Sequence, residues 1–116
     1  MANSELLDML KQGIDIWNEW RKQNRDIRAD LSRADLSRAD LRGADLTGAN
    51  LSRASFTRAD LRRADLCEVD LTRATLNEAD LRGAVLDGAI LVGTTLENAN
   101  LAGCSIHGIS AWNVRL

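Results

Sequence analysis

Side chains that commonly catalyse reactions or bind metals are scarce in this chain of 116 residues. There is one histidine, His107, and there are two cysteines, Cys67 and Cys104. A structural zinc site takes a close set of four Cys, His or carboxylate ligands, which these three residues do not supply. No phosphate-binding loop and no Ser-His-Asp motif is recognisable. We therefore expect no catalytic residue, no cofactor and no metal ion, and we expect both cysteines to be reduced rather than joined.

Charged side chains are abundant, and the two signs are interleaved. The chain has 17 acidic and 15 basic residues, a net charge of −2. Aspartates recur at intervals of five, but the Gly-Gly-x-Gly-x-Asp motif of calcium-binding repeats is absent. The pattern predicts an exposed surface of ion pairs that adds little stability. An anion-binding or protein-binding stripe is the alternative, and its arginines form two series with a spacing of twenty: Arg33, Arg53 and Arg73, and Arg42, Arg62 and Arg82.

The spacing of these side chains follows from a repeat of five residues. Counting in fives from Leu31 to Leu116, seventeen of eighteen positions hold a large apolar residue, and most have a small residue two positions earlier. On an α-helix, leucines five apart would spread around the whole cylinder. On a β-strand they would alternate between the two faces. Each unit must therefore contain a turn, and it can then form one side of a four-sided coil.

Four units complete one coil, so each residue is expected to lie beside the residue twenty positions later. Coils joined by backbone hydrogen bonds rise by about 4.8 Å each. The large apolar residues would then stack inside the coils and form the core: Leu31, Leu36, Leu41, Leu46, Leu51, Phe56, Leu61, Leu66, Leu71, Leu76, Leu81, Leu86, Leu91, Leu96, Leu101 and Ile106.

The units Ala-Asp-Leu-Ser-Arg at 29–33 and 34–38, and Ala-Asp-Leu-Arg-Gly at 39–43, resemble those of the pentapeptide repeat proteins. The resemblance implies a right-handed quadrilateral β-helix. We thus expect an all-β solenoid of about four coils with an α-helical cap at its N-terminal end. Residues 1–28 are predicted to be the capping helix and a connector, and residues 29–116 the β-helix.

One amphipathic helix is predicted from residue 4 to about residue 24. Its apolar residues at helical spacing are Leu6, Leu10, Ile14 and Trp17. Gly13 lies in the middle and costs about 1 kcal/mol, so packing must hold the helix together. We expect the helix to cover the edge and the core of the first coil. A membrane-surface or partner-binding helix is the alternative, although its balanced charge argues against anionic lipid.

The surface changes character after residue 84, where charges become fewer. The outward positions there carry Ile90, Val92 and Trp112, and such an apolar patch often contacts another protein. The last coil shows no cap, and an uncovered coil end is an exposed edge. Two-fold pairing of such ends into a homodimer would cover both. Contact with a domain that follows Leu116 is the alternative.

These features predict a non-catalytic scaffold or protein-interaction module, as part of a larger bacterial signalling or regulatory protein whose partner is unidentified. The resemblance also suggests a DNA mimic that binds topoisomerases, but the near-neutral, arginine-rich surface disfavours it. Interleaved carboxylates argue against direct nucleic-acid binding, and a filled rod offers no substrate pocket. The sequence shows no signal peptide and no bilayer-spanning run, so we predict a cytoplasmic protein without membrane contact.

Overall fold

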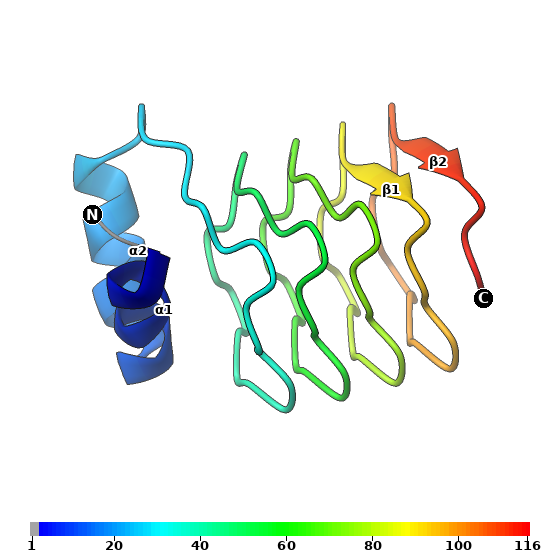
Figure 1. Cartoon of the computed structure of the whole chain (residues 1–116), viewed down its shortest axis with the longest axis horizontal. Helices are drawn as coiled ribbons and strands as arrows, with labels where there is room; N and C mark the ends of the chain where they lie inside the picture. The colour runs from blue at the N-terminus through cyan, green and yellow to red at the C-terminus, as the bar shows by residue number, and fades with distance from the viewer. Residues whose placement is uncertain (1–2) are drawn as a thin grey trace.

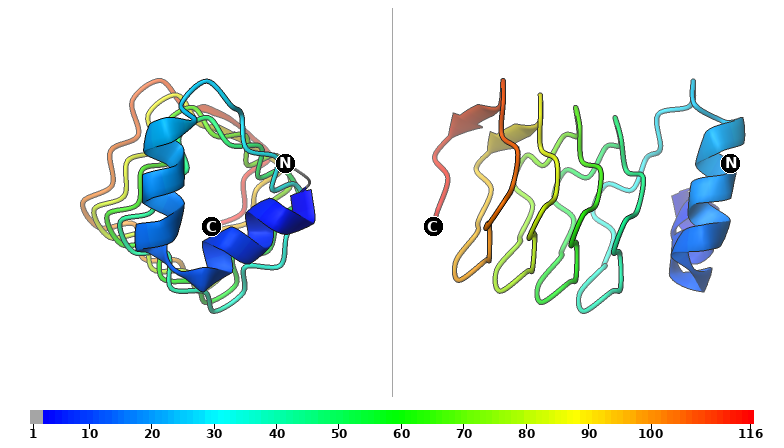
Figure 2. Two further views of the ribbon diagram at one scale, coloured as in Figure 1. Left: turned by 90° about the vertical axis from the view of Figure 1, so that its left-hand side faces the viewer. Right: turned by 180° about the vertical axis from the view of Figure 1, so that it is seen from behind.

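The computed structural model describes residues 3–116 and places two helices at one end of a stack of coils (Figure 1). The helices are α1, Asn3–Gln12, and α2, Ile14–Gln23. The prediction of one helix is therefore wrong, because the chain breaks at Gly13, where φ is 147° and ψ is 153°. A continuous helix of about 20 residues would be about 30 Å long, but the stack is only 24 Å wide. The break lets both helices lie across the end of the stack (Figure 2).

The rest of the chain winds into coils of twenty residues. Parallel bridges join the residue before each core position to the residue twenty later, from Asp30 and Asn50 to Thr95 and Arg115. Successive coils begin at residues 29, 49, 69, 89 and 109, so four full coils and the start of a fifth follow the helices. Seen along the stack, the coils superpose into a four-sided outline (Figure 2). The period of twenty agrees with the prediction from the sequence.

Two short strands are the only ones within residues 3–116. They are β1, Ile90–Val92, and β2, Ser110–Trp112, which pair in parallel. Elsewhere the pairing between coils is reduced to single bridges, because each side of a coil turns again after a few residues.

Every backbone N–H group of the repeat unit 49–53 finds an acceptor. Asn50 donates to the coil before, Leu51 and Arg53 donate to the coil after, and Ala49 closes the preceding turn. The remaining N–H, that of Ser52, donates to Oδ1 of Asn50 at 3.1 Å. The same bond to the residue two positions earlier recurs in other units, where the acceptors are Asp30, Asp35, Asp40, Asp45, Asp60, Asp65, Asp70, Asp80 and Asn100. Aspartate or asparagine precedes the core leucine because the coil leaves one N–H per unit to satisfy.

Each unit turns directly after its core residue. The N–H of Ala34 donates to the carbonyl of Leu31 at 3.1 Å, and the third residue of this turn, Arg33, has a φ of 61°. A positive φ at that position is typical of a type II turn and favours glycine. Glycine occupies the equivalent place in seven turns: Gly43, Gly48, Gly83, Gly88, Gly93, Gly103 and Gly108.

The core is a column of side chains inside the coils. These side chains are buried along most of the stack but exposed at its C-terminal end. Predicted core residues from Leu31 to Leu96 are at most 6% exposed. Leu101 is 36% exposed and Ile106 is 55% exposed, so the prediction that these two are buried is wrong. They belong to the last full coil, where no further coil covers their outer side within the described residues.

Candidate protein-interaction surfaces

The N-terminal end of the stack is closed by side chains of α2 that take the place of a preceding coil. Trp17 donates from Nε1 to the carbonyl of Asp45 at 2.7 Å, and Arg21 donates to the carbonyl of Thr47 at 3.2 Å. The side-chain oxygen of Asn18 accepts the N–H of Asp45 at 2.8 Å. In later coils the equivalent groups bond to the coil before. The cap therefore satisfies backbone groups as well as covering apolar ones.

The predicted cap residues are placed at this end, and the sequence analysis missed two others. Leu6, Leu10 and Trp17 are buried, and Ile14 is half-buried against the same core. Asn18 and Arg21 were not predicted. The signal was available for Arg21, because it lies one helical turn after Trp17 and so shares its face.

The C-terminal end of the stack is open. Among residues 3–116, the N–H groups of Leu101, Gly103, Ile106 and Gly108 have no hydrogen-bond acceptor, whereas those of the coil before donate to this coil. Leu116, at an inward position, is 83% exposed. An apolar sheet edge with unpaired backbone groups is a template for pairing with another chain.

The predicted apolar patch of Ile90, Val92 and Trp112 lies next to this end. Val92 pairs with Trp112 across β1 and β2, as the spacing of twenty predicts. Trp112 is 77% exposed and Ile90 is 38% exposed, while Val92 is half-buried. The open end and this patch place exposed apolar side chains in the same part of the rod.

In one of the two predicted arginine series, every guanidinium group forms an ion pair. Arg42, Arg62 and Arg82 each pair with the aspartate two residues before, at N···O distances of 2.8, 2.6 and 2.6 Å. Arg42 and Arg62 also lie 3.8 and 3.7 Å from the aspartate of the next coil. The hydrogen bond from Arg42 lowers the pKa of Asp40 to about 2. These arginines and their aspartates form the neutral, ion-paired surface that the charge pattern predicts, which we call the ion-paired wall.

The other series occupies a different place in the repeat unit, three residues and not two after the aspartate or asparagine. Arg33, Arg53 and Arg73 are exposed, and within residues 3–116 none forms an ion pair or a side-chain hydrogen bond. Of the two series, this is the one whose guanidinium groups have no partner within residues 3–116.

The structure brings together a serine, a histidine and an aspartate, which the sequence analysis did not foresee. Ser105 donates from Oγ to Asp87 at 2.6 Å and lies 3.0 Å from Nδ1 of His107, which is itself 3.5 Å from Asp87. In a nucleophilic triad the serine and the carboxylate approach opposite ring nitrogens. Here both approach Nδ1, and the serine proton goes to the carboxylate, whose pKa this bond lowers. The trio stabilises the stacking of two coils and does not activate the serine.

An open groove of about 950 Å³ lies between the junction of the helices and the first coil. The expectation of a rod without any pocket is therefore wrong. Its lining combines Gly13 and Ile14 with Leu36, Asp40 and Arg42, and the described lining residues include no histidine or cysteine. Asp40 and Arg42 are already paired with each other. The other polar lining residues of the groove include Lys11, Asp15, Asp35 and Ser37.

Both cysteines are free, and burial raises the pKa of each thiol, that of Cys67 to about 11. Within residues 3–116 no three His, Cys, Asp or Glu side chains are grouped to hold a metal ion. Over the same range, no helix has the length and apolar character that a bilayer crossing needs.

Comparison with known proteins identifies the repeat. The family model described as pentapeptide repeats matches in eight copies, at residues 29–67, 49–88, 64–103 and 79–110. A search of curated protein sequences finds no match.

Three solved structures are similar to this chain. A pentapeptide repeat protein of the Arabidopsis thaliana thylakoid lumen is 38% identical with a TM-score of 0.71, over 73% of this chain and 59% of that protein. A pentapeptide repeat protein from Nostoc PCC 7120 is 30% identical with a TM-score of 0.71, over 85% of this chain and 95% of that one. HetL, which is involved in heterocyst differentiation regulation in Nostoc, is 34% identical with a TM-score of 0.63, over 76% and 47%.

The chain thus spans 59% of the Arabidopsis protein and 47% of HetL, so the roles of those whole proteins do not transfer to it. The matched repeats, in contrast, extend from residue 29 to residue 110. The chain therefore belongs to the pentapeptide repeat family, whose fold is a right-handed quadrilateral β-helix.

Proposed function

We propose that this chain is a non-catalytic scaffold that binds protein, and that its open end pairs with the open end of a second copy. The observation that supports this is the difference between the two ends of the rod. Core residues are at most 6% exposed from Leu31 to Leu96, whereas Ile106 and Leu116 are 55% and 83% exposed. Unpaired backbone N–H groups lie beside these side chains.

The capped end explains why pairing would involve two like ends. Stacking of an open end onto the N-terminal end of another copy would need the edge that Trp17, Asn18 and Arg21 already occupy. The two helices lie across that end (Figure 2), so within residues 3–116 the C-terminal end is the one that a second copy reaches directly. Two such ends related by a two-fold axis form a closed dimer and not a filament.

Charge and area are compatible with this pairing. The last twenty residues carry one acidic residue, Glu97, and one arginine, Arg115, so two copies would not repel each other. The end is about 24 Å across in each direction. Two such faces would bury roughly 1,100 Å² in total, at the low end of the range for specific interfaces.

Sedimentation of the 116-residue chain over a range of concentrations tests the proposal. We expect the mass to rise towards that of a dimer, and Ile106→Asp or Trp112→Arg to keep the chain monomeric. The control is Ile16→Asp, which places the same charge on an exposed isoleucine of α2 at the capped end. A wild-type chain that stays monomeric at all concentrations would contradict the pairing.

Duplex-DNA mimicry is the weaker proposal for this surface. It requires a rod with dense negative charge, but the aspartates of the ion-paired wall, Asp40, Asp60 and Asp80, are each neutralised by an arginine. The cytoplasmic location and the absence of catalysis remain predictions. A relative of known structure lies in the thylakoid lumen, so the family is not confined to one compartment.

A further inference from the structure

Five exposed arginines lie at two neighbouring corners of the stack. Residues twenty apart share a corner, so Arg33, Arg53 and Arg73 lie at one corner, and Arg38 and Arg58 lie at the next. All five are the third residue of a turn and have φ values of 60° or 61°. We call these five residues and the side of the coils between them the basic face.

The fold does not require arginine at these turns. A residue with a Cβ adopts a positive φ at an energetic cost, whereas glycine adopts it freely. Seven turns of the same stack have glycine at this position. Arginine at the basic face therefore strains each turn slightly, as Glu68 and Asn98 do at other turns, so turn geometry gives no reason for arginine there.

Contacts within the chain do not provide that explanation. Among residues 3–116, the guanidinium groups of Arg33, Arg38, Arg53 and Arg73 form no ion pair and no hydrogen bond. Of the five, only Arg58 has a partner, Glu78 in the next coil. Coils lie about 4.8 Å apart, so the arginines of one corner are close enough to repel one another. A negatively charged group from outside the chain would relieve this repulsion.

Hydroxyl groups occupy the side of the coil between the two corners. Ser37, Ser55, Thr57 and Thr75 lie there at outward positions, and the hydroxyls of Ser37 and Ser55 are 2.8 Å apart. The described carboxylates on or beside the face are Glu78, which pairs with Arg58, and Asp35 and Glu97, at the two ends of this side. The centre of the face thus combines charged and neutral hydrogen-bond donors.

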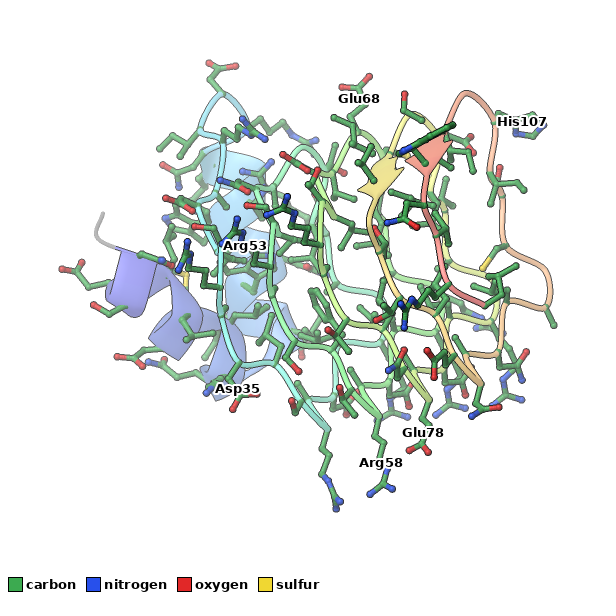
Figure 3. The ribbon with its side chains drawn as sticks, turned by 45° about the vertical axis from the view of Figure 1, so that its right-hand side comes forward. Asp35, Arg53, Arg58, Glu68, Glu78 and His107 are labelled. Atoms are coloured by element: carbon green, nitrogen blue, oxygen red, sulfur yellow. The ribbon has the colours of Figure 1, made fainter. Side chains whose placement is uncertain are left out.

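The opposite side of the stack has the opposite charge. Its outward positions carry Asp45, Asp65, Glu68 and Asp87. Figure 3 shows Glu68 projecting from one edge of the stack, and Arg58 and Glu78 projecting together from the other. The small net charge of the chain therefore conceals a basic face and an acidic face, which the balance of 17 acidic and 15 basic residues does not reveal.

We propose that the basic face binds an acidic, extended segment of a partner protein. Carboxylates would accept paired hydrogen bonds from the free guanidinium groups, which are the strongest exposed donors available. The serine and threonine hydroxyls would bond the backbone or the remaining carboxylate oxygens of the segment. A nucleic acid is a poorer fit, because every nucleotide carries a phosphate that Asp35, Glu97 or the net negative charge of the chain would repel, whereas an acidic segment can have neutral residues opposite these two carboxylates.

A fluorescein-labelled octaglutamate peptide is a suitable probe, titrated with the 116-residue chain at about 50 and about 150 mM NaCl. Binding should be saturable and weaker at the higher salt. Substitution of Arg33, Arg53 and Arg73 together by Gln should weaken binding about tenfold, because three exposed charge pairs are lost. Glutamine keeps the Cβ and the turn strain and removes the repulsion between the three arginines, so the thermal midpoint should not fall.

Two controls separate the basic face from net charge. Arg63→Gln removes an unpaired arginine with a φ of 59° at a third corner, and it should leave peptide binding within about twofold. The combined change of Arg42, Arg62 and Arg82 to Gln removes the same charge from the ion-paired wall.

Equal loss of binding in both triple variants would overturn the proposal, as would a wild-type chain that does not bind the peptide. Tighter binding of a twelve-residue oligothymidylate than of octaglutamate would also overturn it. The end-to-end pairing uses other residues, so either proposal can fail alone.

Discussion

At the scale of single residues, the aspartate or asparagine that precedes most of the core leucines has a defined task. Three N–H groups of a unit bond to neighbouring coils and one closes a turn, which leaves one N–H without a backbone acceptor. The side-chain oxygen of the aspartate or asparagine accepts it, as Asn50 accepts the N–H of Ser52. The repeating polar residue therefore stabilises the coil and does not mark a binding site.

Asn50→Ala should lower the free energy of unfolding by about 1 kcal/mol, because the N–H and the hydroxyl of Ser52 both lose their acceptor. Asn50→Asp keeps an oxygen in the same place and should be close to neutral. Urea unfolding followed by circular dichroism measures both. An alanine variant as stable as the aspartate variant would show that this bond contributes nothing.

The ion-paired wall should make the stability of the folded state depend on pH in the acidic range. Hydrogen bonds from arginine hold the pKa values of Asp40, Asp60 and Asp80 below the ordinary value of 3.8, that of Asp40 at about 2. A carboxylate with a lowered pKa stabilises the folded state above its unfolded pKa, and this contribution is lost as pH falls through the folded pKa.

The urea midpoint of the wild-type chain should thus change little above the unfolded pKa and fall between about pH 4 and about pH 2. Changing all three aspartates to asparagine should reduce that fall, while Asp30, Asp35 and Asp87 keep part of it through their own lowered pKa values. Identical acid profiles for the two proteins would refute the role of the wall.

At the scale of elements, α2 acts as a substitute for a coil. It buries Trp17 completely against the column of leucines, and it also bonds to the carbonyl and N–H groups of the first coil. The cap is specific for this edge because its donors and acceptors match the backbone groups exposed there. A purely apolar cap would have left those groups buried without partners.

Trp17→Ala should destabilise the chain by about 3–5 kcal/mol, since it opens a cavity and removes the bond to Asp45. Ile16→Ala, on the same helix, should cost far less because Ile16 is 50% exposed. Thermal and urea unfolding compare the two. Similar losses in both variants would mean that helix propensity, and not the cap contact, dominates.

At the scale of the described rod, residues 3–116, the helices cover one end and no further coil covers the other. Contacts in a coil stack are made only with adjacent coils, so stability is a sum of neighbouring interfaces. A middle coil has two such interfaces, whereas the last coil has one within the described residues. The open end should therefore exchange and unfold locally before the middle does.

Leu61→Ala should cost about 2–5 kcal/mol, because Leu61 is fully buried between two coils. Leu101→Ala, in the same column but 36% exposed, should cost less than half as much. Both are measured at concentrations where the chain sediments as a monomer. Amide hydrogen exchange should also be slower at Leu61 than in the last coil. Equal costs would indicate that the described end is covered in solution.

The period of five determined most of this fold from the sequence alone. Neither a helix nor a strand accommodates an apolar residue every five positions, so the four-sided coil, the stacking by twenty and the column from Leu31 to Leu96 follow from the pattern. The helical cap could be predicted in part, through the spacing of Leu6, Leu10 and Trp17. These features are local or periodic, and they repeat often enough to leave few alternatives.

Three features depend on the tertiary structure and could not be read from the five-residue period: the break between the helices, the exposure of the last coil and the contacts between coils. The helix breaks at Gly13 because the end of the stack is narrower than one continuous helix. Leu101 and Ile106 fit the core pattern but are exposed, because burial depends on the presence of a next coil. The two arginine series have the same spacing, but Arg42, Arg62 and Arg82 each lie two residues after an aspartate and pair with it, which is a local arrangement. Only the stacking of coils brings Arg42 and Arg62 close to a second aspartate, because that aspartate belongs to the next coil.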